Sequence, residues 1–220
     1  MTIRLIYIPR DRADADTKDQ GNAPSLLAQA EKWRSRLEAR QHVFKIVCRG
    51  ENFEGNPADG GADNQIYVYG GHGLAGYNGA GWPGDPGTSG SVVVPAREIA
   101  EQISDRGWAP SLFTGRLKVY SCFSGNPGSS VAFAALVANE MRTRGWTNCT
   151  FWGYLTKISQ VHQTLNGVKA GLIASYMAKN DDSIDEAALK QELIGQEHRW
   201  ATVGDRQMPI GRVSAQRVEF

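Results

Sequence analysis

A histidine and a cysteine each follow a short apolar segment of this sequence. Residues 65–69 run into Gly-Gly-His72-Gly73, and residues 116–120 run into Ser-Cys122-Phe-Ser-Gly125. A cysteine attacks carbonyl groups as its thiolate, and a nearby imidazole can stabilise that thiolate and later protonate the leaving amine. Glycines beside both residues let the backbone approach a bound peptide and direct N–H groups at an oxyanion.

Both apolar segments have the composition of buried strands. They are rich in β-branched and aromatic residues and break into small residues, as a strand does where it ends in a loop. Neighbouring parallel strands end at the same edge of a sheet, where such folds place their ligand sites. If these two strands are neighbours, we expect His72 and Cys122 to face each other at that edge.

The rest of the chain alternates between strand and helix patterns, which predicts an α/β fold with a doubly wound, mostly parallel sheet and helices on both faces. With 220 residues and 41% apolar content, we expect one domain over residues 1–220. Strands are predicted at residues 3–8, 42–48, 65–69, 117–121 and 148–154, with an edge strand within 210–218, and helices at residues 26–37, 95–106, 131–141, 163–177 and from a capping box at Ser183 to near Gly195.

Two segments are predicted to be irregular. Residues 10–23 are charged, carry four aspartates and show no periodicity, which indicates a loop. Residues 73–90 are rich in glycine, and long loops of this kind are either functional or mobile. Two readings stay open for this second segment: a lid or substrate wall that uses Tyr77 and Trp82 as contact residues, or a surface insertion.

Charge and cysteine content exclude several classes of function. The net charge is +1 without a basic stripe, which argues against nucleic acid as a partner. Three cysteines without Cys-x-x-Cys spacing predict neither a disulfide framework nor a zinc site, and Cys48 and Cys149 are expected to be inert core thiols. No apolar run reaches membrane-spanning length, so we expect no membrane insertion and a cytoplasmic location. Export without a cleaved signal, as a toxin or effector, would leave no trace in the sequence.

The two motifs together resemble those of caspase-like cysteine peptidases. Residues 69–76, Tyr-Gly-Gly-His-Gly-Leu-Ala-Gly, resemble the His-Gly block of that superfamily, and residues 121–125 resemble its Cys-x-Ser-Gly block. The histidine precedes the cysteine by fifty residues, the separation typical of caspases. The cysteine block is most similar to that of metacaspases, with legumain-type peptidases next.

The resemblance implies a cysteine endopeptidase that hydrolyses protein or peptide substrates through a Cys122–His72 dyad. The backbone N–H groups of Gly73 and Cys122 would then form the oxyanion hole. No cofactor or metal is required. Calcium activation occurs among metacaspases, and the clustered aspartates of residues 11–19 are the feature that would suit it. The resemblance covers a core of residues 1–155, and residues 156–220 take the place of the small-subunit region.

The predicted substrate pocket departs from the family pattern at Tyr120. Metacaspases commonly carry an aspartate at this position and caspases a glutamine, and tyrosine supplies neither the charge nor the amide. The resemblance places Tyr120 and Ser121 on one wall of the pocket. Tyr154 and Lys157, followed by Gln160, are candidates for the other wall.

Two alternative functions belong to other classes. A cysteine amidase or acyl-transfer hydrolase would pair Cys122 with a histidine that follows it, and His162 lacks the His-x-Glu pattern of that class. A non-catalytic binding module would keep the fold without the chemistry, although intact His72 and Cys122 argue against it. The remaining histidines, His42, His162 and His198, are expected to be structural or exposed.

Overall fold

The computed structural model describes residues 2–19, 24–38, 44–155, 178, 185–193, 198–203, 206–211 and 217–220. The chain divides into two compact units. The first comprises residues 1–158 and 218–220, and the second comprises residues 159–217. The predicted helix at residues 163–177, together with Lys157, Gln160 and His162, lies outside the described residues.

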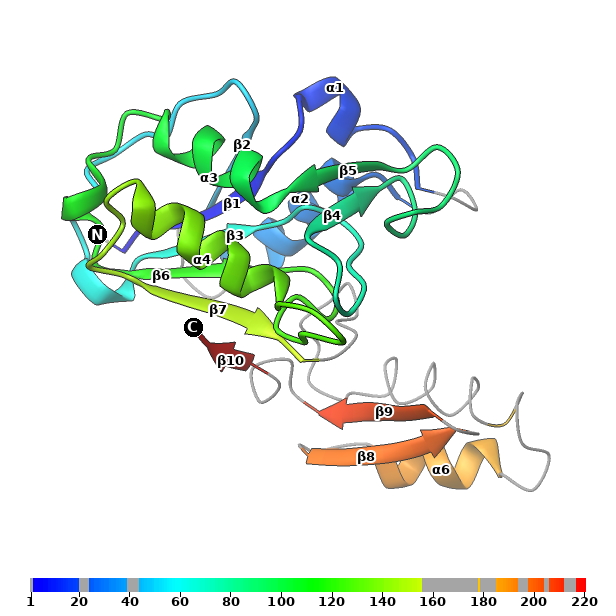
Figure 1. The fold of residues 1–220 in the computed structure, drawn as a ribbon. Helices are drawn as coiled ribbons and strands as arrows, with labels where there is room; N and C mark the ends of the chain where they lie inside the picture. The colour runs from blue at the N-terminus through cyan, green and yellow to red at the C-terminus, as the bar shows by residue number, and fades with distance from the viewer. Residues whose placement is uncertain are drawn as a thin grey trace. The chain divides into compact units, whose positions relative to one another are not determined.

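The first unit is built on a six-stranded sheet with the order β10-β7-β6-β3-β1-β2. The pairs β1–β2, β1–β3, β3–β6 and β6–β7 are all parallel, and Figure 1 shows the sheet across the middle of this unit. The fold is therefore α/β with a mostly parallel sheet, as predicted. The strands are β1 (Arg4–Ile8), β2 (Phe44–Cys48), β3 (Gln65–Val68), β6 (Arg116–Val119), β7 (Thr150–Tyr154) and the edge strand β10 (Arg217–Glu219).

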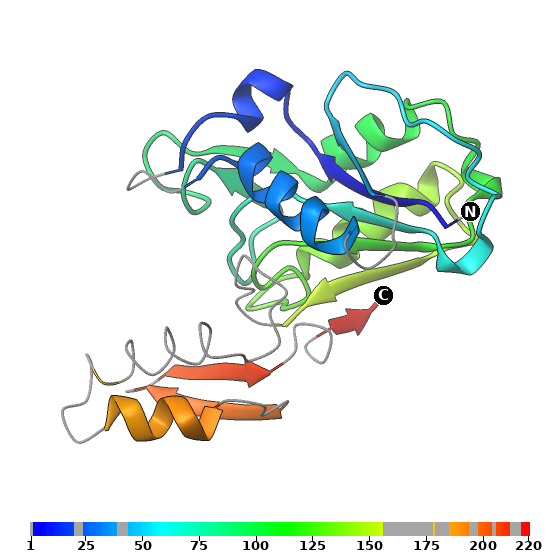
Figure 2. The same ribbon diagram turned by 180° about the vertical axis from the view of Figure 1, so that it is seen from behind.

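Helices lie on both faces of this sheet. Helices α3 and α4 cover one face, and α2 covers the other, as the opposite views of Figures 1 and 2 show. The helices predicted at residues 26–37, 95–106 and 131–141 are confirmed, with ends shifted by a few residues. Their bounds are α2 (Leu26–Glu38), α3 (Ala96–Ser104) and α4 (Phe133–Thr143).

The two faces of the sheet carry different cores because side chains alternate along each strand. Leu5, Ile66, Leu117 and Phe151 belong to a mixed core of aliphatic and aromatic side chains that also contains buried residues of α3 and α4. The neighbouring positions carry aromatic rings that pack on Trp33 of α2, whose ring centroid lies 4.8 Å from that of Tyr67 and 4.7 Å from that of Tyr120. Each face therefore buries its own helix layer.

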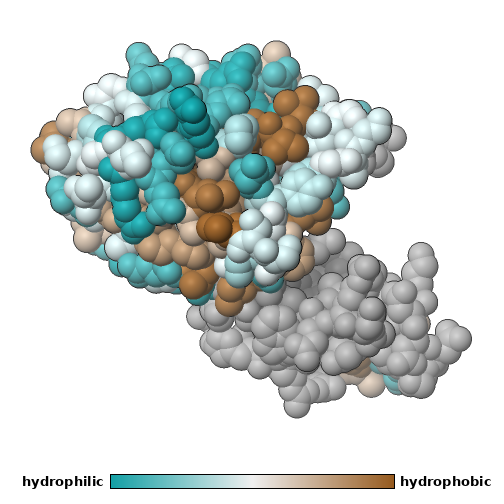
Figure 3. Space-filling model, viewed as in Figure 1, coloured by the Kyte–Doolittle hydropathy of each residue, from teal (hydrophilic) through white to brown (hydrophobic). Residues whose placement is uncertain are grey.

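Two segments predicted as irregular contain regular structure. Residues 12–15 form the short helix α1 (Arg12–Ala15). Residues 79–82 form β4 (Gly79–Trp82), which pairs antiparallel with β5 (Val92–Pro95). The prediction of a loop without structure through residues 73–90 is therefore wrong, because the partner of β4 lies beyond the segment and is invisible to local composition. Figure 3 shows hydrophobic surface over this hairpin and hydrophilic surface over α3, and Val92 is one of the exposed apolar residues.

The second unit contains α6 (Glu186–Leu193) and an antiparallel pair of strands, β8 (His198–Val203) and β9 (Arg206–Gly211). Helix α6 was predicted to begin with a capping box at Ser183. The cap is instead Asp185, whose Oδ1 accepts hydrogen bonds from the N–H groups of Ala187 and Ala188 at 2.9 and 3.1 Å. Aspartate satisfies the free N–H groups of a first turn as serine does. None of the helices among the described residues has the length and apolar character to cross a bilayer.

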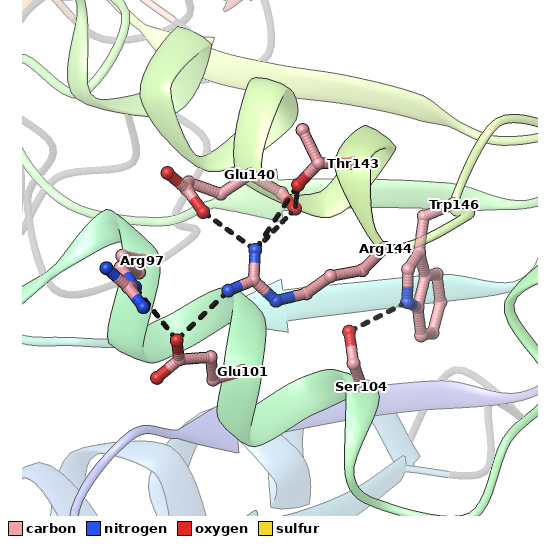
Figure 4. A network of polar contacts seen from close by, with 7 residues as sticks. All are labelled: Arg97, Glu101, Ser104, Glu140, Thr143, Arg144 and Trp146. Carbon is pink, nitrogen blue, oxygen red and sulfur yellow. Dashed lines mark hydrogen bonds and ion pairs between the residues drawn. The ribbon is translucent and has the colours of Figure 1, made fainter.

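Helices α3 and α4 are joined by a network of polar side-chain contacts (Figure 4). The guanidinium of Arg144 contacts Glu140 at 2.7 Å and Glu101 at 3.1 Å. Nearby, Trp146 is fully buried, and its Nε1–H donates a hydrogen bond to Oγ of Ser104 at 3.1 Å. Trp146 thus combines a large apolar area with a satisfied polar atom.

Replacing Trp146 by alanine should destabilise the first unit by about 3–5 kcal/mol, because the change leaves a large cavity and an unpaired Ser104 hydroxyl. The free energy of unfolding, measured by urea denaturation, tests this expectation. Arg97→Ala is the matched control on the same surface, since the Arg97 side chain is 75% exposed and its ion pair with Glu101 is open to water. An equal loss in both variants would contradict this account of the helix pair.

Candidate functional site

The strands that precede His72 and Cys122 are direct neighbours. Strands β3 and β6 pair in parallel with Val68 opposite Val119, and the N–H of Tyr120 continues the pairing by donating to the carbonyl of Val68 at 2.8 Å. His72 and Cys122 therefore follow strands that end at the same edge of the sheet. The predicted neighbour relation between the two strands is confirmed.

The two loops touch through their backbones at Gly73. A β-carbon placed on Gly73 would lie 2.2 Å from the carbonyl oxygen of Cys122 and 3.2 Å from Oγ of Ser121. Only glycine fits this approach. Within the described residues, the N–H of Gly73 donates to no acceptor. It is therefore available to donate a hydrogen bond to a bound ligand.

His72 is held by the β4–β5 hairpin. Its backbone exchanges two hydrogen bonds of 2.9 Å with Gly81, and its ring stacks on Trp82 with centroids 5.5 Å apart and an interplanar angle of 14°. Gly71, at φ 103°, allows the close approach, because a β-carbon there would lie 2.6 Å from the carbonyl oxygen of Gly81. Trp82 is 3% exposed. Its predicted role as an exposed contact residue of a lid is therefore wrong, whereas Tyr77 is 40% exposed.

Two carboxylates contact the imidazole of His72. Nε2 lies 2.7 Å from Oδ2 of Asp19, and Nδ1 lies 3.2 Å from Oδ1 of Asp85. An imidazole donates to both carboxylates only when both of its nitrogens carry a proton. A carboxylate therefore lies beside each ring nitrogen of His72, where it can accept a ring N–H.

The turn after Cys122 is fixed in an unusual conformation. Phe123 has φ 55°, in the left-handed region that non-glycine residues rarely adopt. The Ser124 hydroxyl donates to the carbonyl of Val119 at 2.7 Å and accepts from the N–H of Tyr154 at 3.1 Å. The N–H of Gly125 donates to the carbonyl of Tyr154 at 2.8 Å. The cysteine thus sits at a sharp bend that is fastened to β6 and β7.

The three cysteines differ in burial. Cys48 and Cys149 are buried, and loss of solvation raises the pKa of each thiol to about 11. Cys122 is partly exposed. Burial of Cys48 and Cys149 agrees with the expectation that they are core thiols.

The residues predicted to line the substrate pocket lie behind the cysteine. Tyr120 and Tyr154 are 2% and 3% exposed, with ring centroids 5.1 Å apart, and burial raises the pKa of Tyr120 well above its usual value. The hydroxyl of Ser121 is buried and has no hydrogen-bond partner in the described part of the chain. Their role in a pocket stays a prediction, and Lys157 lies outside the described residues.

The aspartates of residues 11–19 were predicted as one acidic cluster, but in the structure they contact different partners. Asp11 pairs with Arg49, Asp16 accepts from the hydroxyl of Ser25, and Asp19 reaches His72. The signal that could have identified Asp19 is strand order, because β1 lies beside β3 and its following segment emerges at the same edge. Within the described residues, no group of three or more His, Cys, Asp or Glu side chains is arranged to hold a metal ion.

Alkylation by iodoacetamide at pH 8 under native conditions should modify Cys122 and spare Cys48 and Cys149. A thiol with a pKa of about 11 is ionised to about one part in a thousand at that pH. Peptide mapping by mass spectrometry reads the modified sites, and alkylation in urea provides the control in which all three react. Native labelling of Cys48 or Cys149 at the rate of Cys122 would contradict the burial described above.

Comparison of the chain with models of protein families, with curated proteins and with solved structures finds no match in any of the three. Its chemistry is therefore argued from the geometry of Cys122, His72 and their surroundings alone.

Proposed function

We propose that this protein is a cysteine endopeptidase with a caspase-like arrangement of its catalytic residues. One observation carries the proposal: the backbones of Gly73 and Cys122 meet at the shared edge of β3 and β6. This contact brings the loop of a titratable imidazole against the loop of a partly exposed thiol.

The proposed reaction uses the side chains of Cys122 and His72 and the backbone N–H groups of Gly73 and Cys122. The Cys122 thiolate attacks the scissile carbonyl carbon, and the resulting oxyanion accepts hydrogen bonds from the N–H groups of Gly73 and Cys122. His72 gives its proton to the leaving amine as the C–N bond breaks. Water then attacks the thioester and passes a proton to His72, and the thiol is regenerated when the acid product leaves.

The rigid surroundings of both residues support this function over a binding role. The imidazole is fixed by Trp82 and by backbone bonds to Gly81, and the cysteine turn is fixed through Ser124. Left-handed backbone at a non-glycine residue costs free energy, and such strain concentrates at functional sites.

Substrate preference is argued from the residues behind the cysteine. Tyr120 and Tyr154 carry no formal charge and are almost fully buried, so they present no charged group to the residue before the cleaved bond. Asp85 lies beside His72, and its side chain is 53% exposed. Its carboxylate could form an ion pair with a basic side chain of an approaching substrate.

The test is cleavage of a diverse peptide library by the wild type beside Cys122→Ala and His72→Ala, analysed by mass spectrometry. We expect the wild type to cut after a consistent type of residue and both variants to lose at least about 10²-fold in rate. Cys48→Ala is the matched control, because it removes a buried thiol remote from the proposed chemistry.

Three outcomes separate the alternatives. Cleavage that survives His72→Ala and disappears in His162→Ala would favour the amidase class. Release of ammonia from amide substrates without peptide cleavage would point the same way. Complete inertness of the wild type, with and without calcium, together with failure of Cys122 to react selectively with iodoacetamide, would overturn the catalytic proposal and favour a binding module.

A further inference from the structure

The carboxylate of Asp19 is built into the site from a segment remote in sequence. Its Oδ2 lies 2.7 Å from Nε2 of His72, and its Oδ1 accepts the N–H of Gly84 at 2.7 Å. The side chain is 8% exposed. A buried carboxylate with two short hydrogen bonds has a fixed orientation, because charge-assisted bonds of this length are strong.

The same segment also holds the indole that stacks on His72. The carbonyl of Thr17 accepts the Nε1–H of Trp82 at 3.2 Å. Residues 17–19 therefore restrain the imidazole in two ways, through the plane of Trp82 and through the Asp19 carboxylate at Nε2. Restraint of both the plane and one nitrogen leaves the ring a single orientation.

The second carboxylate on the ring differs in kind. Asp85 reaches Nδ1 at 3.2 Å from the connection between β4 and β5, and its side chain is 53% exposed. An exposed ion pair competes with water and contributes little. A substrate can therefore displace Asp85 from Nδ1, whereas Asp19 is enclosed at Nε2.

We propose that Asp19 is a positioning residue for His72: it accepts the Nε2–H, fixes the tautomer and orientation of the ring, and leaves Nδ1 to exchange protons. The inference rests on the proposed peptidase activity. Nδ1 takes the proton of the Cys122 thiol, gives it to the amine as the C–N bond breaks, and takes a proton from water during hydrolysis of the thioester. Asp19 stays ionised throughout and stabilises the imidazolium at Nε2.

Asp19→Asn tests this role, because asparagine keeps an oxygen for the Gly84 N–H and presents an amide N–H to Nε2. The wrong ring tautomer then results, and we expect kcat on a cleaved library peptide to fall about 10²- to 10⁴-fold with KM little changed. Asp14→Asn is the matched control, since Asp14 is an exposed aspartate of the same segment. Thermal unfolding of both variants checks that each remains folded.

A spectroscopic readout tests the positioning independently of turnover. In wild type labelled with ¹⁵N-histidine, the Nε2–H of His72 should give a slowly exchanging, downfield proton signal, assigned by its absence in His72→Gln. The signal should persist in Asp14→Asn and disappear in Asp19→Asn. The rate at which iodoacetamide modifies Cys122 should fall in Asp19→Asn and stay unchanged in Asp14→Asn.

The results distinguish this inference from the proposed function. If the wild type cuts no peptide but the Nε2–H signal depends on Asp19, the peptidase proposal fails and the positioning stands. If the wild type is active and Asp19→Asn keeps its kcat, or if the wild type lacks the downfield signal, the positioning role is overturned.

Discussion

The candidate site depends on one close contact, the approach of Gly73 to the carbonyl oxygen of Cys122. Parallel pairing of β3 with β6 brings the two loops to the same edge, and the absence of a side chain at Gly73 lets them meet. Any larger residue would push the histidine loop away from the cysteine loop. The chemistry proposed above depends on this contact, because it brings the loops that carry His72 and Cys122 together.

The sheet that fixes this contact is stabilised by two unlike layers. A mixed core of aliphatic and aromatic side chains packs beneath α3 and α4, whereas Trp33 of α2 packs against a cluster of tyrosines that includes Tyr67 and Tyr120. Burial of apolar area holds both layers. The aromatic layer extends to the candidate site, since Tyr120 packs on Trp33 and lies two residues before Cys122.

Much of the fold and half of the site could be predicted from the sequence. Apolar runs that break into small residues marked the strands before His72 and Cys122, and apolar helix patterns marked α2, α3 and α4. The β4–β5 hairpin was missed because glycine-rich composition resembles a loop until its partner, the valine run of β5, is paired with it. The cap of α6 was misplaced because Ser183 and Asp185 are both good capping residues and only hydrogen bonds distinguish them.

The sequence by itself determined the residue types and the order of the elements, and it identified His72 and Cys122 as candidate reactive groups. Periodicity and strand composition are properties of a few consecutive residues, so they can be recognised from the sequence alone. Only the tertiary structure decided which of four aspartates meets His72, that Trp82 stacks on its ring, and that Asp85 takes the other nitrogen. These contacts join residues that are far apart in the chain or in separate loops, and they depend on strand order and hairpin pairing, which local sequence does not encode.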